Sequence, residues 1–280
     1  MQEVELGGPR ELHLSKNHID SVDVSSSGKR IIIGWSALEG NTWDGGLTLL
    51  SNDGKEICSR YSPAGISMAR FSGPKIILAG RDDGNVAIYS ANNLEEMQKF
   101  GVHDDFVSCV ADDPHHESQF ASCGWDGSIH LWDWQSKSKP VTSYHNAHQG
   151  HVNEVVYSHL DPNLFSTVGW DGFLREWDRR ESPSVGCSSI VNIGQISSCV
   201  SYERSRNGML LIGSDAGDIV QIDMRGGSNS LIVHSSRIHS GRIRRIAACP
   251  STSSGLFAIA SDDTTYTICE SSVHGIIQRR

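Results

Sequence analysis

Hallmarks of several protein classes are missing from this sequence of 280 residues. Its seven cysteines are odd in number and never spaced Cys-x-x-Cys. This predicts a reduced, intracellular protein with neither disulfides nor a cysteine zinc site. The longest apolar runs, such as Ile31–Ile33 and Met209–Ile212, are far too short to span a bilayer. The first residues also lack the basic start and apolar core of a signal peptide.

A surplus of basic residues is missing as well. The chain has 24 Lys and Arg against 33 Asp and Glu, which gives a net charge of -9. A general nucleic-acid binder needs a basic face to contact phosphates, so we expect no direct binding of nucleic acid. The acidic balance instead suits basic partners, such as arginine-rich tails.

No stretch shows a convincing helical period, but the sequence repeats itself. A histidine followed four residues later by Val or Ile occurs at His18, His103, His148 and His239. His103 and His148 are 45 residues apart, and the other two intervals, of 85 and 91 residues, are each close to two periods. Trp132-Asp133 and Trp177-Asp178 are also 45 residues apart. A period of about 40–45 residues with Trp-Asp endings is typical of the blades of a β-propeller.

Each period also has the pattern of short antiparallel strands. Asp126-Gly127 and Asp171-Gly172 lie between alternating apolar runs, and Asp-Gly in that context predicts a hairpin because the turn needs positive φ. We therefore predict an all-β fold, a single WD40 β-propeller domain over residues 1–280. Its six recognisable repeats cover roughly residues 18–60, 61–102, 103–147, 148–190, 191–238 and 239–280.

The two ends of the chain both predict an outer strand. These are Glu11–Leu14, before the first repeat, and Gly275–Arg279, after the sixth. A strand that precedes a repeat's histidine belongs to the previous blade, so a closed ring of six blades has room for only one of them. We therefore expect a seven-bladed ring that lacks its last repeat, with strand edges left exposed. The alternative is a six-bladed ring.

Histidine, hydroxyl and carboxylate residues recur inside the repeats, together with the tryptophans. One set is His103, Ser122, Asp126 and Trp132, and the second is His148, Thr167, Asp171 and Trp177. A nucleophilic hydrolase uses such residue types, but a catalytic set occurs once, whereas this set recurs with the period. We predict a structural hydrogen-bond network in a protein that is not an enzyme, because these groups can satisfy one another. In the sixth repeat Ile259 replaces the hydroxyl, so apolar packing should hold that blade.

Two other groups could bind a ligand but have a simpler interpretation. His115 and His116 could ligate a metal, but adjacent residues of a strand point to opposite faces, and both lie in a polar segment. Arg242, Arg244 and Arg245 could contact phosphate, but a solvated strand edge is the simpler interpretation. The glycine clusters lack the strand–loop–helix context of a phosphate site. We expect neither a metal nor a cofactor.

The first repeat contains an unusual segment, Gly34–Gly46, which is longer than the hairpin turns of the other repeats. It predicts a flexible, glycine-rich loop. Trp35 continues an apolar strand and should pack into the blade. Trp43 lies on the far side of the loop, and an exposed aromatic side chain on a loop is a typical interface anchor. We predict a partner-binding site made of Trp43, Leu38, Asn41 and Thr42.

Three segments carry a family resemblance. Gly34–Leu50, His103–Ser108 and Pro183–Ser188 resemble the WD-repeat subunit of the methylosome, in matching order over most of the chain. The resemblance implies a scaffold that binds the N-terminal barrel domain of a type II protein arginine methyltransferase, with a contact at Trp43. It implies the presentation of basic substrates, histone tails and Sm proteins, for symmetric arginine dimethylation in the cytoplasm and nucleus. The cofactor, S-adenosylmethionine, belongs to the enzyme.

A short motif leaves an alternative function open. Trp177-Asp178-Arg179-Arg180 matches the Trp-Asp-x-Arg pattern of the substrate receptors of cullin-RING ubiquitin ligases. This pattern is common among WD proteins. A third possibility, an enzyme in propeller form, is disfavoured by the periodic placement of its polar residues.

Overall fold

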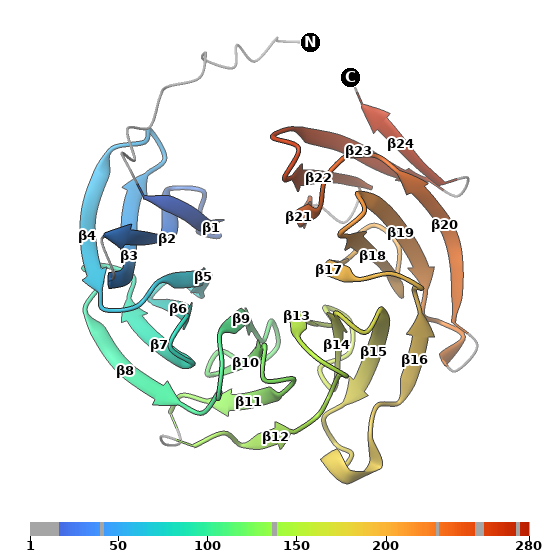
Figure 1. Cartoon of the computed structure of the whole chain (residues 1–280), viewed down its shortest axis with the longest axis horizontal. Coiled ribbons are helices and arrows are strands. Elements are labelled where there is room, and N and C mark those ends of the chain that lie inside the picture. The colour runs from blue at the N-terminus through green and yellow to red at the C-terminus, as the bar shows by residue number, and fades with distance from the viewer. Residues whose placement is uncertain are drawn as a thin grey trace.

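The strands of this chain form six blades around a central channel. The computed structural model describes residues 17–39, 42–135, 139–227, 230–249, 255–272 and 275–279. In these residues the strands make six four-stranded sheets, which stand side by side like the blades of a propeller (Figure 1). A short 3-10 turn, Pro183–Val185, follows the third strand of blade 4. The all-β propeller fold predicted from the repeats is confirmed.

Every blade is a meander of four antiparallel strands, with the first strand beside the channel (Figure 1). Blade 1 has β1 (His18–Val24), β2 (Arg30–Glu39), β3 (Thr42–Ser51) and β4 (Glu56–Ser62), and blade 2 has β5 (Ile66–Ser72), β6 (Ile76–Arg81), β7 (Asn85–Ser90) and β8 (Glu96–Gly101). Blade 3 has β9 (Val107–Asp112), β10 (Gln119–Gly124), β11 (Ile129–Asp133) and β12 (Thr142–Tyr144), and blade 4 has β13 (Val152–Tyr157), β14 (Leu164–Gly169), β15 (Phe173–Asp178) and β16 (Ser189–Asn192). Blade 5 has β17 (Ser197–Tyr202), β18 (Met209–Ser214), β19 (Asp218–Asp223) and β20 (Leu231–Arg237), and blade 6 has β21 (Ile243–Ala248), β22 (Leu256–Ser261), β23 (Tyr266–Ser272) and β24 (Gly275–Arg279).

Glycine makes the turns between the second and third strands of blades 3 and 4 possible. Gly127 and Gly172 both have φ of 75°, a conformation that other residues rarely adopt. Each follows an aspartate, so the two Asp-Gly turns predicted from the sequence are present. They fix the register in which β10 pairs with β11 and β14 pairs with β15.

Buried tryptophans join neighbouring blades. Trp132 on β11 contacts the ring of Phe100 from blade 2, at 4.8 Å between centroids. Trp177 on β15 contacts Tyr144 from blade 3 in the same way, at 5.1 Å. Both indoles are almost fully buried, so each contributes a large apolar area to the packing between blades.

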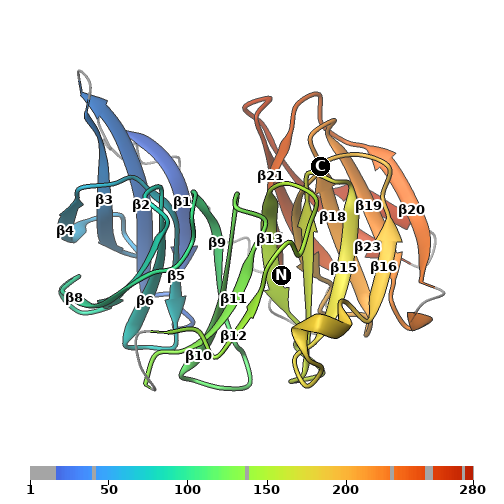
Figure 2. The ribbon, with the colours of Figure 1, turned by 60° about the horizontal axis from the view of Figure 1, so that its bottom comes forward.

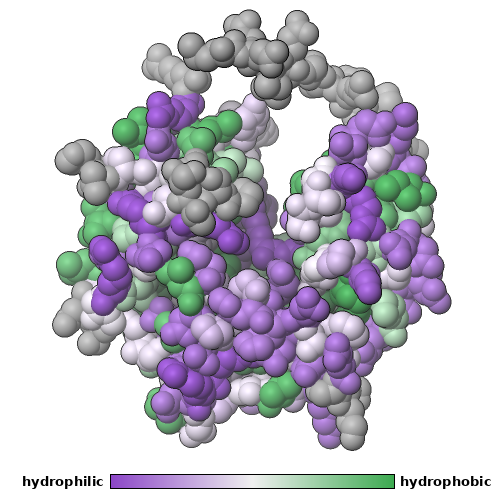
Figure 3. All heavy atoms as spheres, turned by 180° about the vertical axis from the view of Figure 1, so that it is seen from behind, coloured by the Kyte–Doolittle hydropathy of each residue, from purple (hydrophilic) through white to green (hydrophobic). Residues whose placement is uncertain are grey.

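The six blades leave the ring open. Blades 1 and 6 face each other across an opening beside β1 and β21 (Figure 1), and the view from behind shows a gap there (Figure 3). Apolar side chains on these two blades are exposed, with Val22 on β1 at 59% and Tyr266 on β23 at 76%. The arrangement agrees with the expected open ring. The predicted strand Gly275–Arg279 is present as β24 and pairs with β23, whereas Glu11–Leu14 lies outside the described residues.

Two predictions about what the chain lacks can be compared with the structure. All seven cysteines lie in the described segments, and all seven are free thiols. Within those segments no helix has the length and apolar character needed to cross a membrane.

Candidate functional site

The polar set of the third blade forms one continuous hydrogen-bonded chain. His103 bonds to the Asp126 carboxylate through Nδ1, at 3.0 Å, and to the Ser122 hydroxyl through Nε2, at 2.8 Å. The Ser122 oxygen in turn accepts the indole N–H of Trp132, at 2.9 Å. We assign the histidine proton to Nδ1, because the carboxylate can only accept. Ser122 is 0% exposed, so its hydroxyl supports the blade and is closed to a substrate.

The fourth blade repeats this chain. His148 bonds to Asp171 at 2.9 Å and to the Thr167 hydroxyl at 2.8 Å, and Trp177 donates its indole N–H to the same hydroxyl at 2.9 Å. Burial lowers the pKa of His148, which favours its neutral form. Burial alone would raise the pKa of Asp171, but hydrogen bonds from His148, the Gln149 N–H and Arg175 hold it well below its usual range.

The sixth blade breaks the pattern at the residue that the sequence singled out. His239 bonds through Nδ1 to Asp263 and Thr265, both at 3.1 Å. Its Nε2 is buried without a partner, because Ile259 occupies the position of the hydroxyl. Ile259 is fully buried in a cluster with Ile243 and other apolar residues, so apolar packing holds this part of the blade as expected.

The segment predicted as a flexible loop is an extended hairpin, and that prediction was wrong. β2 and β3 are ten residues each and pair from Arg30–Ser51 to Glu39–Thr42. The glycines allow close packing. A side chain on Gly46 would meet the Trp35 ring and the Arg60 carbonyl, both at 2.4 Å. Trp35 is half-buried there and donates its indole N–H to Thr48 at 3.2 Å, so it packs into the blade.

Leu38 and Trp43 stand opposite each other near the tip of this hairpin. Figure 2 shows β2 and β3 extending beyond the strands of blade 2. Leu38 is 63% exposed and Trp43 is 50% exposed, while the Trp43 indole N–H donates to the Asp82 carboxylate of blade 2. The ring is therefore held in place with one part open to solvent. Asn41 and the side chain of Thr42, the other predicted members of this site, lie outside the described residues.

Four aromatic rings, which the sequence reasoning missed, form a row across blades 3 and 4. Phe106 lies 4.7 Å from Trp125, Trp125 lies 4.5 Å from His151, and His151 lies 4.1 Å from Trp170, measured between ring centroids. We call these four residues the aromatic ladder. A signal was present in the sequence, since Phe106 and His151 are 45 residues apart, as are Trp125 and Trp170.

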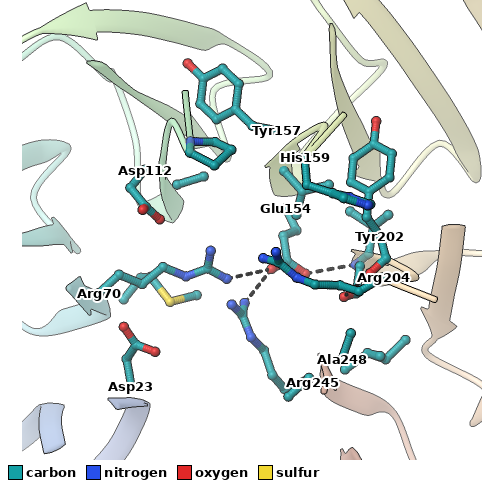
Figure 4. A pocket seen from close by; sticks show the side chains of 18 of the residues that line it. Asp23, Arg70, Asp112, Glu154, Tyr157, His159, Tyr202, Arg204, Arg245 and Ala248 are labelled. Atoms are coloured by element: carbon teal, nitrogen blue, oxygen red, sulfur yellow. Dashed lines mark hydrogen bonds and ion pairs between the residues drawn. The ribbon is translucent and has the colours of Figure 1, made fainter. Parts of the chain in front are cut away.

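Charged residues from several blades meet in the central channel. Figure 4 shows Arg70 and Arg245 reaching toward Glu154 from different blades. The buried Glu154 carboxylate accepts from Arg70 at 3.3 Å, from Arg245, and from the backbone N–H of Val200 at 2.8 Å. Burial raises the pKa of Glu154 to about 8, although Arg70 and the Val200 N–H oppose that shift.

These contacts correct the interpretation of the basic run as a solvated edge at Arg245, whereas Arg244 is exposed as expected. Arg245 points into the channel and joins blade 6 to blade 4, while Arg244 pairs with Asp262 and Arg242 with Asp215. The channel cavity, of about 390 Å³, is also lined by Asp23 and Asp112. Since arginine and carboxylate groups are intermixed there, the cluster ties blades 2, 4, 5 and 6 together.

The remaining candidates also have structural partners. His115 and His116 are exposed; they bond to the Ser158 carbonyl and to Asp113, both at 3.0 Å, and thus to different groups. Arg180 of the Trp-Asp-x-Arg pattern pairs with Asp178 at 2.5 Å. Arg225 pairs with Asp223 in the same way in blade 5.

One histidine cluster has the composition of a metal site. The ligand atoms of His103, Asp126 and His130 lie within 4.8 Å of one another. The Ser128 hydroxyl lies between the two rings, 3.1 Å from His103 Nδ1 and 3.0 Å from His130 Nε2. The two ring nitrogens that a metal would need, His103 Nδ1 and His130 Nε2, are therefore already hydrogen-bonded within the blade.

Comparison with known proteins supports the same architecture. The family described as WD domain, G-beta repeat matches residues 94–133 and 138–178. A chain in a solved structure titled "Crystal Structure of Mitotic Checkpoint Complex" superposes with a TM-score of 0.78 over 90% of this chain and 77% of that one, at 15% identity. That likeness shows the fold. The chain is a β-propeller that contains WD40 repeats.

Two curated relatives differ in how much of the chain they match. Methylosome protein WDR77 of Xenopus laevis is 33% identical over 76 residues, 27% of this chain and 22% of that protein. The Ribosome biogenesis protein WDR12 homolog of Chlamydomonas reinhardtii is 25% identical over 263 residues, 80% of this chain and 58% of that protein. The chain thus spans less than two thirds of the length of either relative.

Proposed function

We propose that this WD40 propeller is a non-catalytic scaffold that binds a type II protein arginine methyltransferase. It presents basic substrates, histone tails and Sm proteins, for symmetric arginine dimethylation, and it acts in the cytoplasm and nucleus. The methyltransferase supplies the S-adenosylmethionine and the chemistry. The observation that carries the proposal is the projecting β2–β3 hairpin with its exposed Trp43 and Leu38.

The hairpin has the properties of a docking element. An aromatic side chain that is fixed before binding loses little conformational entropy when a partner covers it. Trp43 meets this condition because its indole N–H is bonded to Asp82. Leu38 lies across the hairpin from it, so the two side chains offer one apolar knob to a pocket of the enzyme.

Two further observations support this assignment. The relative named Methylosome protein WDR77 is 33% identical to 76 residues of this chain. The net charge of -9 also suits substrates rich in arginine. The two His–hydroxyl–Asp sets support the proposed lack of catalysis, because they recur with the blade period and hydrogen-bond to buried tryptophans.

The WDR12 homologue motivates a second candidate, a role in ribosome assembly, because its match covers 80% of this chain. The Trp-Asp-x-Arg pattern motivates a third candidate, a substrate receptor of a cullin-RING ubiquitin ligase.

A pull-down from native extract, read by mass spectrometry, distinguishes the three possible partners: a methyltransferase, ribosome-assembly factors and a cullin adaptor. We expect the methyltransferase on the wild-type chain and less of it on Trp43→Ala. Tyr266→Ala removes another exposed ring, on β23 of blade 6; it is the matched control and should behave as wild type. Recovery of ribosome-assembly factors or a cullin adaptor, without a methyltransferase, would refute the proposal.

A further inference from the structure

The aromatic ladder occupies a turn position that recurs around the propeller. In five blades the first residue of the turn between the second and third strands donates its backbone N–H to a loop carbonyl. These donor–acceptor pairs are Asp82 to Gly65, Trp125 to Phe106, Trp170 to His151, Asp215 to Ile196, and Asp262 to Arg242. Blades 3 and 4 therefore place tryptophan where blades 2, 5 and 6 place aspartate.

The fold does not require an aromatic residue at this turn position. Aspartate makes the same backbone hydrogen bond in three blades, and the two indoles remain 39% and 44% exposed. The rings instead contact each other along the surface, with Trp125 and His151 stacked at an interplanar angle of 10°. Exposed aromatic rings that form a continuous row are typical of an interaction surface.

Carboxylates border the ladder on the Phe106 side. Asp104 and Asp105 are exposed and directly precede Phe106. The turn of blade 2, with Asp82 and Asp83, packs against them, because a side chain on Gly84 would lie 3.3 Å from the Asp105 carbonyl. The carboxylate of Asp104 makes no hydrogen bond or ion pair with the described residues, so its charge is available to a ligand.

Aromatic faces beside carboxylates suit a cation. A guanidinium group stacks on an indole face through cation–π attraction, and its N–H groups can then donate to a carboxylate at the edge of the ring. Single-stranded nucleic acid also stacks on aromatic rows, but its phosphates would be repelled by Asp104 and Asp105. The charges thus favour a cationic peptide over a nucleic acid.

We propose that the aromatic ladder binds an arginine-bearing peptide segment. One guanidinium lies on Trp170, the ring at the end of the row, or against the exposed part of Trp125, and neighbouring arginines face the carboxylates of Asp104 and Asp105. This inference deepens the proposed function, because it assigns the basic substrate to a surface of the scaffold. Two blades form the surface within one chain, so the binding itself needs no enzyme.

The test measures binding of a fluorescent Arg-Gly repeat peptide to the purified chain by polarisation. The same peptide with citrulline in place of arginine keeps the shape but removes the charge. Trp125→Ala and Trp170→Ala each remove one ring, and Tyr266→Ala is the matched control. We expect the first two variants to weaken binding about 3- to 30-fold, the control to bind as wild type, and the citrulline peptide to bind far more weakly. If Trp170→Ala does not fold, Trp170→Asp replaces it, since three blades carry aspartate there.

The experiment separates this inference from the proposed function. Trp43→Ala should keep the peptide affinity, because Trp43 is not part of the ladder. Peptide binding without methyltransferase binding would support the ladder and refute the proposed function. Equal affinity in the ladder variants, equal affinity for the citrulline peptide, or no binding at millimolar concentration would overturn the inference. Ladder-dependent binding of a single-stranded oligonucleotide in place of the peptide would also overturn it.

Discussion

The hydroxyl of Thr167 offers a sharp test of the structural interpretation of the His–hydroxyl–Asp sets. Thr167→Val keeps the shape of the side chain but removes the oxygen that bonds to His148 at 2.8 Å and to Trp177 at 2.9 Å. Thr167 is 0% exposed, so water cannot replace the lost partner. The variant would leave an indole N–H and an imidazole nitrogen buried without partners.

The magnitude follows from these two groups. A buried polar group without a partner costs about 1–3 kcal/mol, and the extra methyl group regains about 0.8 kcal/mol. For two such groups we expect the free energy of unfolding to fall by about 1–5 kcal/mol. Thr142→Val, on the outer strand β12 where the side chain is half-buried, is the matched control and should change it little.

Urea unfolding followed by far-UV circular dichroism measures both variants. The interpretation requires that Thr167→Val unfolds at a clearly lower urea concentration than Thr142→Val. If Thr167→Val lowers the free energy of unfolding no more than the control does, the hydrogen-bonded chain of blade 4 does not stabilise the blade.

Other predictions concern the same blades. Asp126→Ala and Asp171→Ala should each lower the free energy of unfolding by about 1–3 kcal/mol, because each removes the carboxylate that accepts from a buried histidine and from a backbone N–H; unchanged thermal melts in both would contradict the network. Stability should also fall on acidification. Burial lowers the pKa of His130 from 6.5 to about 3. Below pH 6.5, His130 therefore binds a proton in the unfolded chain but not in the folded chain. At pH 5 this difference in proton binding lowers the free energy of unfolding by about 2 kcal/mol. The His130→Gln variant should therefore lose less stability than wild type between pH 7 and pH 5. An equal loss in both proteins would show that His130 is not the titrating group.

The repeat period made most of the fold predictable from the sequence. Four short strands and their turns fill about 45 residues, and the Asp-Gly turns fix where each set of strands pairs. The hydrogen-bonded chains were predictable for the same reason. His103, Ser122, Asp126 and Trp132 hold fixed positions relative to one turn, so their meeting depends on local register and not on how the blades are arranged.

Features that depend on the arrangement of the blades were not predictable. Arg70, Glu154 and Arg245 come from three blades, and they meet only because the first strand of each blade lines one channel. The aromatic ladder depends on how closely the loops of blades 3 and 4 approach. The β2–β3 hairpin was predicted to be a loop because its glycines suggested flexibility. In the structure, Gly45 and Gly46 instead allow Trp35 and blade 2 to pack closely against the hairpin.

Calorimetry of the purified chain with a purified type II arginine methyltransferase tests the central claim most directly. The account predicts measurable binding by the wild-type chain. It also predicts a loss of about 2 kcal/mol or more for Trp43→Ala, roughly a 30-fold weaker Kd, with an unchanged circular dichroism spectrum. No binding by the wild-type chain, or equal affinity in the folded variant, would contradict the claim that the β2–β3 hairpin is the docking element.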